Sequence, residues 1–73
     1  MPVVLESDSG WTMDALIADL SKTGFRLTAS AILHVGQMLT MRLPRETVRC
    51  QVCWVDGLEA GGIFNGRAGV PTW

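Results

Sequence analysis

The chain has 73 residues, of which 48% are hydrophobic and 18% are charged, and its net charge at pH 7 is −1. The length allows one small domain, and the hydrophobic content excludes a disordered tail. The near-zero charge gives no attraction to nucleic acid, and no apolar run reaches the roughly 20 residues of a membrane-spanning helix.

The N-terminus lacks the basic start and apolar core of a secretory signal, and two cysteines are too few for a disulfide scaffold. We therefore expect a cytoplasmic protein that neither inserts into a membrane nor binds nucleic acid. The sequence contains no set of residues typical of a catalytic or metal site, so we expect no enzyme activity, no cofactor and no metal.

Short strands separated by turns are predicted along the first half of the chain. Residues 3–5 begin a strand, residues 7–10 form a turn, and residues 11–20 form a second strand with alternating faces. A third strand begins at Phe25, after the turn at residues 22–24, because apolar and polar residues alternate there.

The second half continues the pattern. Apolar residues alternate from Leu39 to Leu43, where Pro44 ends the strand, and from Val48 to Trp54, the strongest strand signal. A last strand covers residues 60–64, and residues 66–73 are expected to be an irregular tail. The prediction is an all-β, six-stranded antiparallel barrel formed by a single domain, residues 1–73. The residues expected to be buried in one core are Ile17, Phe25, Leu27, Leu39, Met41, Val52, Trp54 and Phe64.

An Asp-x-Ser-x-x-Gly pattern, Asp19-Leu20-Ser21-Lys22-Thr23-Gly24, joins the second and third strands. Side chains of Asp and Ser bond backbone N–H groups in tight turns, and Gly adopts conformations that other residues avoid. The pattern fits an ordinary turn. It also fits a binding site, because both side chains can accept from a guanine edge and the Ser hydroxyl can donate to a ligand oxygen.

Basic residues cluster around Pro44. Arg42, Arg45 and Arg49 are expected either to contact an anionic ligand or an acidic partner surface, or to form a solvated sheet edge that discourages aggregation. Cys50 and Cys53 lie three apart on one predicted strand, so their thiols should point to opposite sides and remain unbridged.

The motifs follow one another in an order that resembles the PilZ domain, the bacterial cyclic di-GMP receptor family, over roughly residues 3–65. The matching segments are Asp19-x-Ser21-x-x-Gly24, Phe25-x-Leu27, Val35-Gly36, Leu39-x-Met41-x-Leu43, Val48-x-Cys50-x-Val52-x-Trp54 and Gly61-Gly62-Ile63-Phe64. The resemblance implies a PilZ-like split barrel that senses cyclic di-GMP and assigns nucleotide contacts to Asp19, Ser21 and Gly24.

The family's site also uses an Arg-x-x-x-Arg segment ahead of the first strand, and this chain has no Arg or Lys before Lys22. Losing two charge-assisted contacts costs about 3–6 kcal/mol, which turns a micromolar site into a roughly millimolar one. We therefore expect weak or absent binding of cyclic di-GMP by this chain. Substitute contacts to the phosphates would come from Arg26, Arg42 or Arg49.

The expected function is a non-catalytic signalling adaptor of cyclic di-GMP pathways. The alternative is a protein-interaction or dimerisation module that acts without nucleotide. Either way, a homodimer or protein partner is expected to contact exposed apolar residues, for which Trp11, Leu16 and Leu58 are the candidates. In the competing arrangement the C-terminal segment, including Trp73, covers this surface and leaves a monomer.

Overall fold

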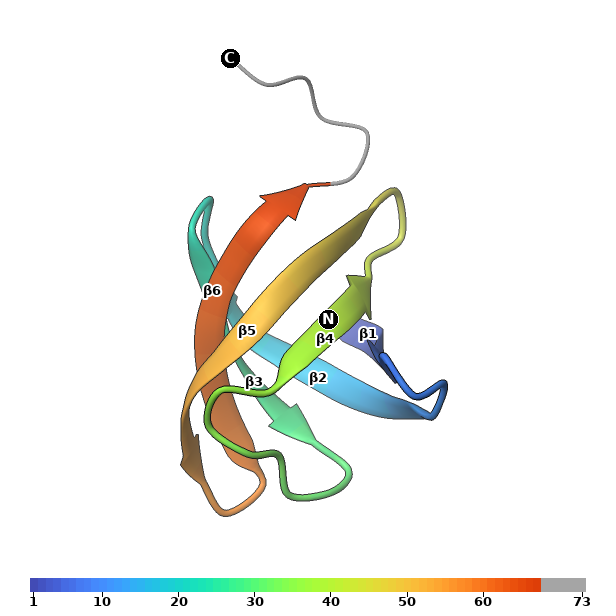
Figure 1. Ribbon diagram of the computed structural model, residues 1–73. Coiled ribbons are helices and arrows are strands. Elements are labelled where there is room, and N and C mark those ends of the chain that lie inside the picture. The colour runs from blue at the N-terminus through green and yellow to red at the C-terminus, as the bar shows by residue number, and fades with distance from the viewer. Residues whose placement is uncertain (68–73) are drawn as a thin grey trace.

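The computed structural model describes residues 1–67, which form six β-strands joined by turns (Figure 1). The strands are β1 (Pro2–Ser7), β2 (Thr12–Leu20), β3 (Gly24–Ala29), β4 (Met38–Arg42), β5 (Thr47–Asp56) and β6 (Glu59–Arg67). The last strand thus continues two residues into the segment expected to be irregular. Residues 68–73, with the interpretations placed on Trp73, lie outside the described residues.

The strands close into a barrel in the order β1-β2-β3-β6-β5-β4, and every neighbouring pair is antiparallel. Closure comes from β1 pairing with β4, where Leu5 lies opposite Met41. The predicted six-stranded antiparallel barrel is confirmed. The interpretation of Arg42 and Arg49 as a sheet edge is wrong, because β4 and β5 each have a strand on both sides.

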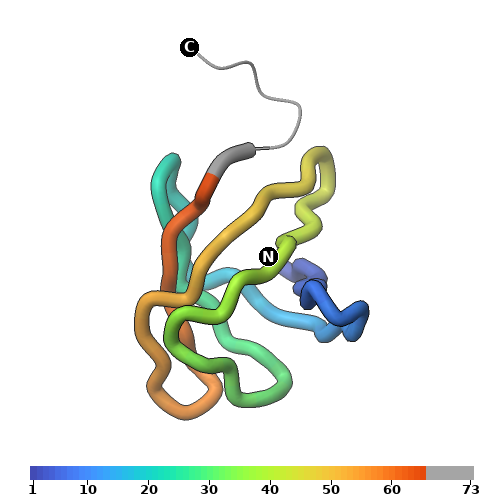
Figure 2. Tube along the Cα trace, viewed as in Figure 1, coloured from blue at the N-terminus to red at the C-terminus, as the bar shows by residue number. Residues whose placement is uncertain are grey.

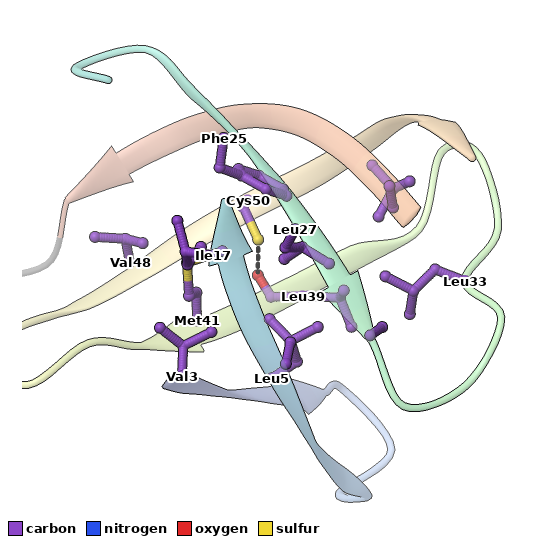
Figure 3. Close-up of a cluster of buried hydrophobic side chains, with 14 residues drawn as sticks. Val3, Leu5, Ile17, Phe25, Leu27, Leu33, Leu39, Met41, Val48 and Cys50 are labelled. Atoms are coloured by element: carbon purple, nitrogen blue, oxygen red, sulfur yellow. Dashed lines mark hydrogen bonds between the residues drawn. The ribbon is translucent and has the colours of Figure 1, made fainter. Parts of the chain in front are cut away.

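The inward-facing side chains of all six strands fill the barrel with one apolar core (Figure 3). Alternation along each strand produces this core, since successive side chains point to opposite faces of a sheet. The Cys50 thiol is buried there and donates to the Leu39 carbonyl at 3.5 Å. The buried residues are Val3, Leu5, Ala15, Ile17, Phe25, Leu27, Ala29, Leu33, Leu39, Met41, Val48, Cys50, Val52 and Ala60.

Trp54 is the clear exception to the predicted core, because its side chain lies on the outer surface with 41% of the residue exposed. The pairing of β5 with β6 shifts by one residue between Val52 and Trp54, which leaves Cys53 as the extra residue of a β-bulge. A bulge reverses the faces of the residues that follow it. Val55 therefore packs against the core in place of Trp54.

Phe64, which was also expected in the core, is half-buried. It packs on Phe25 with ring centroids 5.5 Å apart, so it belongs to the edge of the core. Cys50 is buried, Cys53 is exposed, and both are free thiols, as predicted.

The turns gather at the two ends of the barrel (Figure 2). The β2–β3 turn, with the Asp-x-Ser-x-x-Gly pattern, lies at the end opposite the β5–β6 turn and the β3–β4 connection. Within residues 1–67 no helix is long and apolar enough to cross a membrane.

Candidate functional site

The Ser21 hydroxyl is bonded entirely within the β2–β3 turn. Its Oγ accepts from the backbone N–H groups of Thr23 and Gly24, at 3.3 and 3.1 Å, and donates to the Gly24 carbonyl at 3.2 Å. The turn is joined to β6, because the Phe64 N–H donates to the Thr23 carbonyl at 2.9 Å. Ser21 therefore shapes the turn, as the ordinary-turn interpretation of the sequence predicts.

Gly24 permits close contact between β3 and β6. A Cβ atom at this position would lie 2.6 Å from the Gly62 carbonyl oxygen, closer than real Cβ contacts allow. Glycine is therefore required here because β3 and β6 lie close together. A left-handed backbone is not the reason, since the φ angle of Gly24 is not positive.

Asp19 forms an ion pair with Arg26, its cross-strand partner on β3. Arg26 Nε and Nη2 both contact the same carboxylate oxygen, Oδ2, at 2.7 and 2.6 Å. The hydrogen bond to Asp19, followed by the attraction of its charge, raises the pKa of Arg26. A β-bulge between Ile17 and Asp19 turns the Asp19 side chain to the outer surface. Arg26 faces outward because it alternates with the buried Phe25 and Leu27 on β3.

Trp54 extends this pair into a row across four strands. The register places Trp54 opposite Gly61, Gly61 opposite Arg26, and Arg26 opposite Asp19. The indole lies directly over Gly61, because a Cβ atom there would overlap the ring. The prediction of a buried Trp54 is wrong, and only the pairing of β5 with β6 shows that Gly61 lies beneath the indole.

A hollow of about 320 Å³ opens on the outer surface at this row. Its walls combine an ion pair, an indole and the backbone of the β2–β3 turn. The lining residues are Asp19, Leu20, Ser21, Gly24, Phe25, Arg26 and Trp54. The structure thus brings together Asp19, Ser21, Gly24 and Arg26, four of the six residues that the sequence selected.

Arg42 and Arg49 lie outside the hollow and bond carboxylates of the β1 region. Arg42 Nη2 contacts both oxygens of Glu6, at 3.1 and 3.3 Å. Arg49 Nη1 and Nη2 donate to Asp8 at 2.7 and 3.3 Å, and Nη1 also reaches the Thr40 hydroxyl. The hydrogen bond from Arg49 lowers the pKa of Asp8.

A family model described as the PilZ domain matches residues 1–70, a span that includes all six strands. The chain belongs to the PilZ family. PilZ domains are signalling modules of cyclic di-GMP pathways that bind the nucleotide and interact with proteins. A search of curated proteins found no match to this chain.

The hollow of this PilZ domain combines groups suited to a planar, hydrogen-bonding ligand. The second carboxylate oxygen of Asp19, Oδ1, has no partner among the described residues and can accept from N–H groups. Trp54 gives an apolar wall, and Arg26 is the one cation among the lining residues. Residues 1–67 contain no group of three or more side chains that could hold a metal ion.

Proposed function

We propose that this PilZ domain is a non-catalytic signalling module of cyclic di-GMP pathways, and that residues 1–73 bind the nucleotide weakly at the hollow beside Asp19. The observation that carries the proposal is the state of Arg26, because this single lining cation is already bonded to Asp19. A phosphate must either share the guanidinium with the carboxylate or displace it.

The charge of the ligand makes one engaged cation insufficient. Cyclic di-GMP carries two phosphates, and each charge-assisted hydrogen bond contributes roughly 1.5–3 kcal/mol to binding. No Arg or Lys precedes Lys22 in the sequence, and Arg42 and Arg49 are bonded elsewhere on the barrel. The hollow can therefore accept the guanine edge through Asp19 while leaving most phosphate charge uncompensated.

The same contacts support a non-catalytic role. A nucleophile needs an adjacent base, and a general base needs a reactive lone pair near its target. In the hollow, the Ser21 hydroxyl is occupied by turn hydrogen bonds, and the Asp19 carboxylate is held by a guanidinium. Neither group is activated, so the site is suited to binding.

Isothermal titration with cyclic di-GMP at moderate salt tests the proposal. We expect very weak or undetectable binding, with a dissociation constant of roughly 0.1–1 mM or higher. Asp19→Ala should remove any measurable heat, and Arg42→Ala, which lies outside the hollow, should leave it unchanged. A constant in the low micromolar range or below would contradict weak binding, and loss of binding in Arg42→Ala alone would contradict the position of the site.

A second candidate function is a protein-interaction or dimerisation module that acts without nucleotide. Exposed apolar side chains favour it, since Leu16 is 59% exposed, Leu58 47% and Trp11 39%. The two functions differ in one observable. If the chain binds a protein partner or a second copy with the same affinity in the presence and absence of millimolar cyclic di-GMP, the result supports the second function. If that affinity depends on the nucleotide, the result supports the first.

A further inference from the structure

The outer face of the barrel around β1 carries an apolar groove that shares no lining residue with the hollow. We call it the β1 face and define it by Val4, Asp14, Leu16, Arg42 and Pro44. The groove measures about 740 Å³, and these five residues line it. The groove extends from β4 across β1 and β2 to the end of β3, where Thr28, Ala29 and Ser30 also line it. Within it, β1 has β2 on one side and β4 on the other. Such an apolar depression on a small domain is typical of an association surface.

Opposite charges flank the centre of the β1 face. Val4 lies opposite Asp14 on β2 and opposite Arg42 on β4, so the three side chains form one row across three strands. The Asp14 carboxylate has no ion-pair partner among the described residues. Among residues 1–67, Arg42 bonds Glu6 through Nη2 alone, so Nε and Nη1 can donate to a further acceptor. The row therefore consists of a negative side chain on β2, an apolar side chain on β1 and a positive side chain on β4, with the two charges one strand away from Val4 on either side.

Two residues before Val4 on β1, apolar side chains flank the strand on both sides. Leu16 pairs with Pro2 on the β2 side of β1. On the other side, the segment after β4 brings Pro44 to the groove. Leu16 and Pro44 are both exposed, so each can pack against a surface from outside the chain.

The shape of a twisted sheet is compatible with self-association. A right-handed twist makes the outer face a saddle, rising along one diagonal and falling along the other. Rotation by 180° about an axis that lies in the face and follows one strand converts this saddle into its own complement. Two copies can then pack face to face with aligned central strands, as sheets do in sandwiches.

We propose that the β1 face binds a second copy of this chain about a two-fold axis that follows β1. The rotation brings Val4 onto Val4 of the second copy and Asp14 onto its Arg42. The same rotation packs Leu16 against Pro44 of the second copy. A second copy is favoured over an unrelated partner because one face carries both charges at equal distance from the axis, the arrangement that an isologous interface requires. The inference is independent of nucleotide binding.

Sedimentation equilibrium over roughly 5–500 μM, a range that covers micromolar association, tests the proposal. We expect the wild-type mass to rise toward twice the 7.9 kDa of the chain. Leu16→Asp should weaken the dimer roughly tenfold or more, because it places a charge in the apolar part of the interface. Asp14→Arg and Arg42→Asp should each weaken it several-fold, and the double variant should recover most of the loss because the pair is restored with reversed sign.

Ile63→Asp is the matched control, because this isoleucine is 45% exposed and lies on β6, a strand that pairs with none of β1, β2 and β4. It should dimerise like the wild type, and circular dichroism should show a folded barrel for every variant. A monomer across the whole concentration range would overturn the proposal. A dimer that survives Leu16→Asp and both single charge reversals, or that is lost in Ile63→Asp, would also overturn it.

Discussion

The indole of Trp54 lies directly over the backbone of Gly61, its cross-strand partner on β6. A Cβ atom at Gly61 would overlap Nε1 and Cε2 of the ring and would lie 2.7 Å from Cζ2. The bulge at Cys53 turns the ring outward, and the glycine leaves the space in which it lies. Together these two features place an indole in the wall of the hollow.

Gly61→Ala should displace the Trp54 ring and lower the free energy of unfolding by about 1–3 kcal/mol, the usual cost of overpacking. Urea unfolding measures the loss, and the Trp54 indole N–H resonance reports the displacement. In a Trp54→Ala background the same change should cost little, because the overlapping ring is gone. An equal cost in both backgrounds would mean that another contact makes glycine necessary.

The barrel itself was predictable because alternation is a direct consequence of strand geometry. Ile17, Leu27 and Met41 are buried as the alternation requires. Trp54 was mispredicted because the bulge at Cys53 depends on how β5 pairs with β6, and a single strand's pattern does not contain that register.

The two cysteines should react at very different rates. Burial raises the pKa of the Cys50 thiol to about 11, whereas Cys53 is exposed. At pH 8 the folded protein should therefore show one fast thiol per chain with a disulfide reagent, and two after denaturation. Cys53→Ser should abolish the fast reaction. A fast reaction that persists in this variant would show that the barrel opens readily around Cys50.

The raised pKa of Cys50 also predicts a loss of stability at alkaline pH. Its ordinary value is 9.0, so between pH 9 and about 11 the unfolded chain loses this proton while the folded chain retains it. The unfolded state then binds fewer protons, and the free energy of unfolding falls as pH rises. Urea unfolding at several pH values should show a shallower fall in Cys50→Ala. Identical slopes for the two proteins would contradict the assignment.

Removal of the Ser21 hydroxyl should destabilise the β2–β3 turn. Ser21→Ala loses the hydrogen bonds to Thr23 and Gly24 and should lower the free energy of unfolding by about 1 kcal/mol. Ser21→Thr keeps a hydroxyl and is the control, which should retain most of the stability in urea unfolding. A Ser21→Ala variant as stable as the wild type would show that the hydroxyl does not hold the turn.

An arginine segment added before Met1 should strengthen nucleotide binding. The Met1 carbonyl accepts from the Ile17 N–H at 2.8 Å, and β1 runs antiparallel to β2, so preceding residues are directed along β2 toward Asp19. An extension containing Arg-x-x-x-Arg should tighten cyclic di-GMP binding roughly a hundredfold or more in isothermal titration.

The matched control for that extension carries Ala-x-x-x-Ala and should bind like the unextended chain. Unchanged affinity with the arginine extension would contradict the explanation that missing cations limit binding.

The candidate site was only partly predictable. The pattern at Asp19, Ser21 and Gly24 is contiguous, so the sequence places these residues in one turn. The ion pairs of Arg42 and Arg49 depend on closure of the barrel. Their partners, Glu6 and Asp8, belong to the β1 region, which is distant in sequence. Charge pairing across such a closure is not a property of either segment alone.

A residue-resolved titration of the ¹⁵N-labelled chain with cyclic di-GMP tests the central claim most directly. The account predicts fast-exchange shifts confined to Asp19, Ser21, Gly24, Arg26 and the Trp54 indole, still unsaturated at roughly 0.1 mM nucleotide. Saturation at equimolar nucleotide, or shifts centred on Val4 and Arg42 instead of the hollow, would contradict it.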